Sequence, residues 1–356
     1  MLNLPVYLDN NATTRMDERV MEAMLPYFTQ YYGNAASRGH VFGWQANQGV
    51  EQARKQVALL INAEPNEVIF TSGATEACNL ALKGVFEMYA GKGNHIITAA
   101  TEHPAVLDTC RHIEKLGGDI TFLPVNHDGL INLVDLEKAI KPKTVLVSVM
   151  YANNETGVIQ PIKEIGIICK KHGILFFTDA TQAAGKISVN VEVDKIDMMA
   201  FSAHKMYGPK GVGALYVRRK NPRVRLAALI DGGGHERGIR SGTLNVPGIV
   251  GFGKACELGR IFMKEESERS RKLRDQLETG LMLTGEVFIN GSIEHRLPNT
   301  SNIGFKNIDG EELLIQASKQ IALSAGSACT SATLEPSHVL LALGIDEAVA
   351  GSSIRF

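Results

Sequence analysis

The chain has 356 residues, of which 44% are hydrophobic and 21% charged, and its formal net charge is -1. These values are typical of a globular protein, and the length predicts two domains, with a large α/β unit plus a smaller one as a second arrangement that fits. The balanced charge argues against a nucleic-acid or membrane surface, and no stretch approaches the ~18 apolar residues of a membrane-spanning helix.

Five cysteines are spread through the chain, at Cys78, Cys110, Cys169, Cys256 and Cys329. Their number is odd and no C-x-x-C pair occurs, so we expect neither a disulfide framework nor a zinc site. Free thiols are typical of a reducing compartment. The first residues also lack the basic and apolar pattern of a signal peptide. These features predict a cytoplasmic protein without a metal centre.

Short apolar runs alternate with amphipathic stretches between about residues 17 and 260. The apolar runs predict strands at 68–70, 95–98, 144–150, 174–178, 197–201 and 212–217. The amphipathic stretches predict helices at 74–90, 104–116 and 162–172. This alternation predicts a mostly parallel sheet with helices on both faces. In such sheets ligands bind at the carboxyl ends of the strands.

The pattern changes after about residue 260. Residues 261–283 predict a charged amphipathic helix that leads to a second domain. A strand at 301–305, helices from Glu311 and Pro336, and a strand at 353–356 follow. We therefore expect a large domain at 17–260 and a small domain made of 1–16 and 261–356. The basic run at 218–225 has Asn-Pro at its centre, which predicts a solvent-exposed hairpin turn.

Small and hydroxyl-bearing residues follow the first predicted strand, at 71–76 (TSGATE). The start of a helix carries free backbone N–H groups and the positive end of the helix dipole, both of which suit a phosphate. Capping of the helix by Ser72 or Thr75 is the simpler interpretation of the same residues. Both interpretations stay open at this point.

Polar side chains also follow the next two strands of this series. His103 comes directly before Pro104, the expected first residue of a helix. Asn153 and Asn154 follow the run at 144–150, where amides serve either a turn or a ligand. We expect these side chains at the ligand-binding edge of the sheet.

Two charged residues complete the set at this edge. Asp179 follows the strand at 174–178, and a buried carboxylate needs a partner such as a cationic ring nitrogen. Lys205 follows the strand at 197–201, beside Ser202 and His204. A partly desolvated lysine has a lowered pKa and forms an imine with an aldehyde. A lysine, an acid and a phosphate cradle are together the parts of a pyridoxal phosphate (PLP) site.

Cys329 lies among small and polar residues at 326–333 (GSACTSAT). The other four cysteines lie inside apparent helices and are expected to be buried. The surroundings of Cys329 instead predict an accessible, reactive thiol. Near a cysteine substrate bound at PLP, its thiolate can attack the substrate sulfur and leave a persulfide and alanine. Arg355, in the last strand pattern, suits bidentate binding of the substrate carboxylate.

The whole chain resembles the NifS/IscS-type cysteine desulfurases, which are class V aminotransferase-like enzymes, and most closely the housekeeping IscS branch. The resemblance rests on YLDNNATT, FTSGATEACNLALKG, TEHPAVLDTC, NNETGVIQ, DATQAAGK, SAHKMYGPKGVGALYVRR, GGGHERGIRSGTLNVPGIVG, SAGSACTSATLEPSHVLLALG and SSIRF. It implies an α/β protein of PLP-dependent transferase fold type I. Its large domain would hold a mostly parallel seven-stranded sheet, and its smaller domain would be α+β.

The resemblance also implies roles for individual residues. Lys205 would form the imine with PLP, Cys329 would receive the sulfur, and His103 would stack on the ring and relay protons. The other implied cofactor contacts are Asp179 at the ring nitrogen, Gln182 at the ring hydroxyl, Asn154 at the ring edge, Ala74, Thr75, Ser202 and His204 at the phosphate, and Thr243 at the phosphate in the partner subunit. Arg355 and Asn34 would bind the substrate carboxylate.

The implied reaction removes sulfur from L-cysteine for iron–sulfur cluster assembly and tRNA thiolation. The implied partners are a second copy of the chain, an iron–sulfur scaffold protein and other sulfur acceptors, without direct nucleic-acid or membrane binding. Cys329 would also serve as a transient ligand of an iron–sulfur cluster shared with a partner. The polar, glycine-rich residues at 232–234 and 240–243 have no evident partner within one subunit, which supports a dimer.

Three features depart from the family pattern. Pro104 follows His103 where relatives often have Lys or Asn, and Ala35 follows Asn34 where relatives usually have Pro. The family also continues past Phe356, so we expect this chain to be a fragment or a short member.

Two other functions stay open. The first is another PLP enzyme of fold type I, such as an aminotransferase or a selenocysteine lyase, and the setting of Cys329 argues against it. The second is an inactive homologue that acts as an interaction scaffold. The intact set of Lys205, His103, Asp179 and Cys329 argues against that second function.

Overall fold

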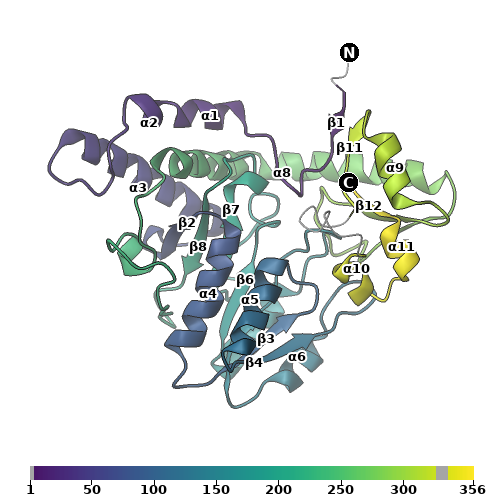
Figure 1. The fold of residues 1–356 in the computed structure, drawn as a ribbon, viewed down its shortest axis with the longest axis horizontal. Helices are drawn as coiled ribbons and strands as arrows, with labels where there is room; N and C mark the ends of the chain where they lie inside the picture. Colours follow the sequence, from purple (N-terminus) through teal and green to yellow (C-terminus); the bar gives the residue numbers. More distant parts are fainter. Residues whose placement is uncertain (1–3, 326–335) are drawn as a thin grey trace.

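A computed structural model describes residues 4–325 and 336–356 of the chain. Seven strands form one sheet in the order β2-β8-β7-β6-β5-β3-β4 (Figure 1). Their bounds are β2 Val68–Thr71, β3 His95–Ala99, β4 Asp119–Leu123, β5 Thr144–Ser148, β6 Leu175–Asp179, β7 Met198–Ser202 and β8 Gly213–Val217. Only β8 is antiparallel to its neighbours. The predicted mostly parallel seven-stranded sheet is confirmed.

Helices cover both faces of this sheet because successive strand residues point to opposite sides. Ile97, Val147 and Phe176 pack in one core with α3 (Val41–Ile61), α6 (Leu133–Ala139), α7 (Ile162–His172) and α8 (Val246–Met282). Their neighbours Ile96, Leu146 and Phe177 pack in the other core with α4 (Ala74–Met88) and α5 (Pro104–Lys115). The sheet is thus buried on both faces, as a parallel sheet requires.

The last third of the chain forms separate, smaller sheets. Strands β9 (Val287–Ile289), β10 (Asn302–Phe305) and β12 (Ser353–Arg355) are antiparallel, in the order β12-β10-β9. Near the N-terminus, β1 (Val6–Tyr7) pairs in parallel with β11 (Ile321–Ala322). The remaining helices are α1 (Glu18–Met24), α2 (Pro26–Thr29), α9 (Gly310–Ala317), α10 (His338–Ala342) and α11 (Glu347–Gly351). The beginning of the chain therefore lies beside its last third (Figure 1).

Helix α8 runs unbroken for 37 residues and is longer than the helix predicted at 261–283. Its first part is buried, and its second part is mostly exposed. Residue 260, at the expected domain boundary, lies inside this helix, and the division into two domains stays a prediction. Within the described residues, no helix combines the length and apolar character needed to cross a membrane.

The predicted solvent-exposed turn at 218–225 is confirmed for residues 220–223, where the Val224 N–H donates to the Arg218 carbonyl at 3.0 Å, but the predicted hairpin is wrong. Strand β8 ends at Val217 and pairs with β2 and β7, so the run does not connect two paired strands. Arg218 is buried, with its guanidinium 2.8 Å from Glu192 and 3.2 Å from Asp197. It also donates to the carbonyl oxygens of Val191 and Ile196. These acceptors explain why an arginine from a basic run is buried.

Candidate active site

A pocket of about 490 Å³ lies at the carboxyl ends of the parallel strands. The predicted site residues that line it are Ala74, Thr75, His103, Asn154, Asp179, Gln182, Ser202, His204, Lys205 and Arg355. Asn34 and Thr243 are exposed and are not among its lining residues. Cys329 lies outside the described residues. One chain therefore brings together most, but not all, of the residues predicted for the site.

The start of α4 forms one end of this pocket. Its N-cap residue, Gly73, makes no side-chain capping hydrogen bond, so capping by Ser72 or Thr75 is not what the structure shows. Gly213 of β8 packs directly against this turn, since a Cβ atom at Gly213 would lie 2.7 Å from the Gly73 Cα. The first backbone N–H groups of α4 thus face the pocket without a side-chain cap, as a phosphate-binding turn requires.

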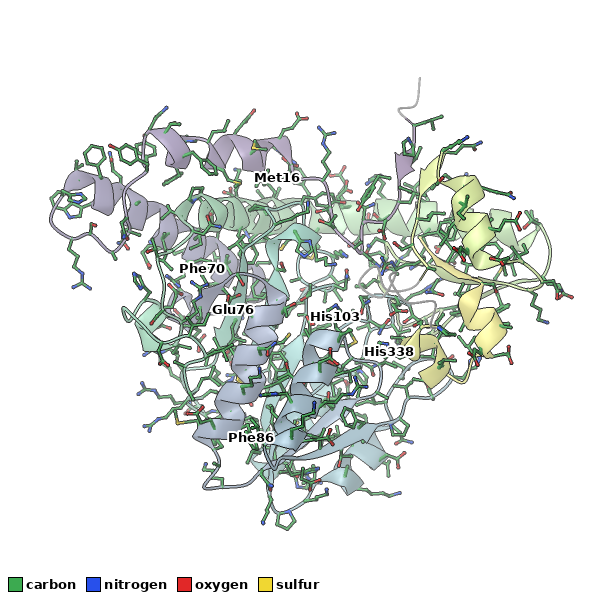
Figure 2. All side chains as sticks on the ribbon, viewed as in Figure 1. Met16, Phe70, Glu76, Phe86, His103 and His338 are labelled. Atoms are coloured by element: carbon green, nitrogen blue, oxygen red, sulfur yellow. The ribbon has the colours of Figure 1, made fainter. Side chains whose placement is uncertain are left out.

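A glycine-rich segment is attached to this turn within the same chain. Arg240 lies 2.8 Å from Glu76, and Glu76 also accepts a hydrogen bond of 2.8 Å from the Ser72 backbone N–H. Glu236 pairs with Arg54 at 2.7 Å and accepts the Phe70 N–H. The expectation that residues 232–234 and 240–243 lack partners within one subunit is therefore wrong for Arg240. Figure 2 labels Glu76 and His103 at the starts of the neighbouring helices α4 and α5.

His103 is the N-cap residue of α5, and its Nδ1 accepts a hydrogen bond of 3.1 Å from the Ala105 N–H. A nitrogen that accepts from a backbone N–H carries no proton, so the ring proton of the neutral form is on Nε2. Burial is the largest cause that lowers the pKa of His103, the negative charge of Asp179 opposes it, and the nearby Lys205 lowers the pKa further. His103 is thus neutral at neutral pH and presents an Nε2–H.

His204 has Nδ1 3.1 Å from the Thr13 hydroxyl. Burial is the largest cause that lowers its pKa to about 4, followed by repulsion from Lys205 and Lys210. An uncharged imidazole here can donate one hydrogen bond to an anion without adding a formal charge.

Asp179 is the last residue of β6, and its side chain is buried. Its Oδ1 accepts a hydrogen bond of 2.9 Å from the Thr181 N–H, and its Oδ2 lies 3.8 Å from the Cys78 sulfur. Within the described residues, the Thr181 hydroxyl is buried without a partner. A buried carboxylate beside an unused hydroxyl fits a polar, cationic ring nitrogen in the pocket.

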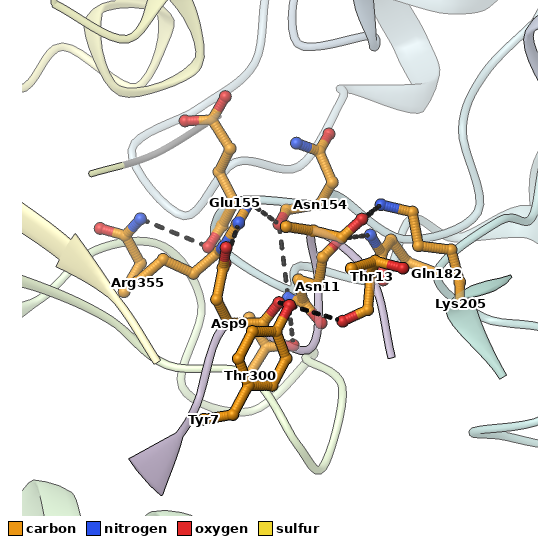
Figure 3. Close-up of polar contacts among 12 residues, drawn as sticks. Tyr7, Asp9, Asn11, Thr13, Asn154, Glu155, Gln182, Lys205, Thr300 and Arg355 are labelled. Carbon is orange, nitrogen blue, oxygen red and sulfur yellow. Dashed lines mark hydrogen bonds and ion pairs between the residues drawn. The ribbon is translucent and has the colours of Figure 1, made fainter. Parts of the chain in front are cut away.

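Lys205 ends the 3-10 turn Ala203–Lys205 that follows β7. Its Nζ donates to the carbonyl oxygens of Asn11, at 2.5 Å, and Ala12, at 2.7 Å (Figure 3). Gln182 Nε2 donates to the same Asn11 carbonyl at 2.9 Å. The N-terminal segment thus supplies acceptors to two predicted cofactor ligands, which sequence reasoning missed because no local pattern marks Asn11.

Arg355 enters the pocket from β12. Its Nη2 lies 2.6 Å from Asp9 Oδ1, and its Nη1 donates to the Asn154 carbonyl at 3.1 Å (Figure 3). In the described residues, its Nε is buried without a partner. Asp9 was not predicted as a site residue, because its proximity to Arg355 comes only from the tertiary fold. Nη1 and Nη2 each carry a second N–H, and these donors suit a substrate carboxylate in the pocket that Arg355 lines.

Comparison with known proteins decides the family. The aminotransferase class-V family matches the chain over residues 6–356. The chain belongs to this family. Class-V aminotransferases of this kind are PLP-dependent, and PLP is the cofactor predicted from the sequence. The uncapped turn of α4, buried Asp179 and Lys205 all fit that cofactor.

Within the class-V family, the chain is similar to proteins named cysteine desulfurase IscS. It is 55% identical to that of Anaeromyxobacter dehalogenans (strain 2CP-C) over 356 residues, which is 100% of this chain and 88% of the relative. It is 56% identical over 355 residues to that of Methylococcus capsulatus (strain ATCC 33009 / NCIMB 11132 / Bath), with the same coverage. The predicted resemblance to the NifS/IscS type is confirmed.

Solved structures of class-V relatives share the fold. A NifS-like protein is 42% identical with a TM-score of 0.91, covering 99% of this chain and 93% of that one. A structure titled SspA in complex with cysteine is 36% identical with a TM-score of 0.87, covering 98% and 97%. The predicted fold type is therefore confirmed.

Proposed function

We propose that this chain is a PLP-dependent cysteine desulfurase that takes the sulfur from L-cysteine onto Cys329 and releases L-alanine. The observation that carries the proposal is the pocket at the strand ends, in which Lys205, Asp179 and the uncapped start of α4 lie together. The relatives named cysteine desulfurase support it over the full length of the chain.

Residues that line the pocket can hold the cofactor and the substrate. PLP, when bound, supplies an electron sink that stabilises negative charge next to the substrate amino group. The buried carboxylate of Asp179 would pair with the cofactor's ring nitrogen. The guanidinium of Arg355, which lines the pocket, would bind the substrate carboxylate and so orient the amino acid.

Proton transfer falls to Lys205 and His103. The carbonyls of Asn11 and Ala12 accept hydrogen bonds from the Lys205 amine. They therefore stabilise the protonated amine whenever it is not covalently bound to the cofactor. His103 is neutral and presents an Nε2–H that donates a hydrogen bond; to transfer a proton, its ring must first take one up at Nδ1 in place of the Ala105 N–H hydrogen bond. Both groups line the same pocket, as proton transfer to a bound substrate requires.

Cys329 is proposed as the sulfur acceptor. Its thiolate would attack the substrate sulfur, and the carbon–sulfur bond would break with its electron pair staying on the substrate carbon. The new sulfur–sulfur bond makes the persulfide, and protonation of the carbon gives alanine. Ser337 and His338 follow the segment that carries Cys329. They contact the Glu155 carboxylate and the Glu102 carbonyl, next to His103. The described chain beyond Cys329 is therefore attached at the pocket.

A homodimer is also proposed, and the exposed apolar side chains of α1 to α3 support it. These side chains belong to Met21, Leu25, Phe28, Tyr32, Val41, Phe42 and Trp44. Such a patch on a water-soluble surface is typical of a protein interface. Asn34 lies within the same stretch of chain, and Thr243 is likewise exposed. Both residues are then proposed to act at the partner's pocket. Light scattering of the purified protein tests whether the dimer forms.

The sulfur acceptors are proposed to be an iron–sulfur scaffold protein and tRNA-thiolation enzymes, in the cytoplasm. The four described cysteines are free and buried, which supports a reducing compartment. Transfer of labelled sulfur from Cys329 to a purified scaffold protein tests this step.

The deciding experiment incubates the PLP-loaded protein with L-cysteine and a thiol reductant, and measures alanine and sulfide. Equal amounts of the two products are expected. Formation of a 2-oxo acid with transfer of the amino group would identify an aminotransferase instead. A protein that binds PLP but turns over neither cysteine nor selenocysteine would be an inactive scaffold.

A further inference from the structure

A second lysine, Lys186, contacts Gln182 from a neighbouring cavity. Gln182 lines the active-site pocket, whereas Lys186 lines an adjoining cavity of about 460 Å³. The Lys186 Nζ lies 2.7 Å from Gln182 Oε1 and 3.2 Å from Asn11 Oδ1. Sequence reasoning gave Lys186 no role.

These contacts fix which end of the Gln182 amide is which. The protonated form of Lys186 can only donate, which places the amide oxygen toward it. A backbone carbonyl can only accept, so the atom that faces the Asn11 carbonyl, at 2.9 Å, is the amide nitrogen. The assignment therefore follows from the partners and does not depend on how the two amide atoms are distinguished.

The Gln182 nitrogen has two N–H groups, and its bond to the Asn11 carbonyl uses one of them. Because the oxygen is held by Lys186, only the nitrogen end can serve the pocket, and it can do so only as a donor. A donor stabilises an anionic ring hydroxyl, whereas the amide oxygen would repel it.

We propose that Lys186 is a positioning residue that locks the Gln182 amide with its N–H end toward the cofactor's ring hydroxyl. This inference rests on the proposed function, in which Gln182 contacts that hydroxyl. Lys186 acts through Gln182 and is not itself a catalytic residue.

The charges around Lys186 agree with this role. Burial lowers its pKa to about 7, and repulsion from the cations Lys205 and Arg355 adds to the effect. Its hydrogen bonds in the described structure are to two neutral amides, those of Gln182 and Asn11. Lys186 lies near two other cations, Lys205 and Arg355, and is held by neutral amides, so its charge contributes little to stability. Its role is therefore better explained by its hydrogen bonds to the two amides.

The test measures the pH at the midpoint of the absorbance change of bound PLP in the wild type, Lys186→Met, Lys186→Arg, Gln182→Leu and the double variant Lys186→Met/Gln182→Leu. Lys186→Met should raise the midpoint by about one pH unit, which is about tenfold in the equilibrium, because the anionic ring hydroxyl loses an oriented donor. Lys186→Arg should largely restore the wild-type value. Lys55→Met, an exposed lysine of α3, is the matched control and should not shift it.

The double variant separates positioning from a direct charge effect. If Lys186 acts through Gln182, its removal adds no further shift in the Gln182→Leu background. An equal shift in both backgrounds, or no shift in Lys186→Met, would overturn the inference even if the wild type makes alanine.

A second measurement uses the PLP-free protein. Urea unfolding of the wild type, Lys186→Met, Gln182→Leu and the double variant should show an energetic coupling between Lys186 and Gln182. Additive effects on the free energy of unfolding would count against the contact. If the four proteins show this coupling but the wild type shows no PLP absorbance, the proposed function is refuted while the contact stands.

Discussion

The carboxylate of Asp9 lies 2.6 Å from the guanidinium of Arg355, and both side chains are largely buried. This pair holds Arg355 in place before any substrate arrives. It also compensates a positive charge that would otherwise be buried alone, which is costly.

We expect Asp9→Ala to lower the free energy of unfolding by about 3 kcal/mol, because it leaves the Arg355 charge buried without its counter-charge. The variant should also raise KM for cysteine more than it lowers kcat, since Arg355 loses its fixed orientation. Urea unfolding and steady-state kinetics measure the two effects. Glu18→Ala removes the exposed pair with Arg15 and should change stability little. An unchanged Asp9→Ala protein would show that the pair is not structural.

Lys205→Ala should abolish covalent attachment of PLP and turnover together. Borohydride reduction followed by peptide mass spectrometry should find the cofactor on Lys205 in the wild type and on no lysine in the variant. Lys186 and Lys210 are the other amines near the pocket. A labelled peptide that contains either of them would show that the assignment of Lys205 is wrong.

His204 should make the PLP-free protein less stable as the pH falls. The unfolded chain protonates this histidine below about pH 6.5, whereas the folded protein does so only below about 4. The unfolded state therefore binds more protons in that window, so stability is present above it and is lost as the pH falls through it. Urea unfolding of His204→Asn at several pH values should show a shallower loss than the wild type. His127→Asn, at an exposed position, should follow the wild type.

Cys329 should react with iodoacetamide much faster than the other cysteines. Cys78, Cys110, Cys169 and Cys256 are buried, and burial raises the pKa of each thiol, that of Cys110 to about 12. Thiolates are the reactive form, so these four should stay protected in the folded protein. Peptide mass spectrometry after brief labelling measures the order. Early labelling of a buried cysteine would contradict it.

Cys329→Ser should keep the absorbance of bound PLP and lose sulfide release from cysteine, because an alcohol is a far weaker nucleophile than a thiolate. Cys256→Ala offers the comparison, since that thiol is buried in α8 away from the pocket lining. A fully active Cys329→Ser enzyme would remove Cys329 from the mechanism.

The strand-end residues could be predicted because parallel strands bring their carboxyl ends to one edge. His103, Asp179 and Lys205 each follow a clear apolar run, and all line the pocket. Strand β4 was missed because it lies at the sheet edge and is only partly buried, so its sequence lacks a continuous apolar run.

The contributions of the N-terminal segment could not be predicted from sequence pattern. Asp9 and Asn11 act through contacts with residues far along the chain, and nothing in their neighbours marks those partners. Arg218 was misjudged for a similar reason, since its acceptors at 191–197 are set by the fold and not by the basic run around it.

The contacts of Asn11 also constrain the order in which the protein folds during synthesis. Its partners include Asn154, Gln182, Lys205 and Thr300, and its neighbour Asp9 binds Arg355, 346 positions away. The large sheet can form on the ribosome once β8 has emerged. The N-terminal segment, in contrast, can pair only after β11 and β12 have been synthesised. Closing such a long loop is slow. The cofactor pocket therefore cannot be complete before residue 355 has left the ribosome.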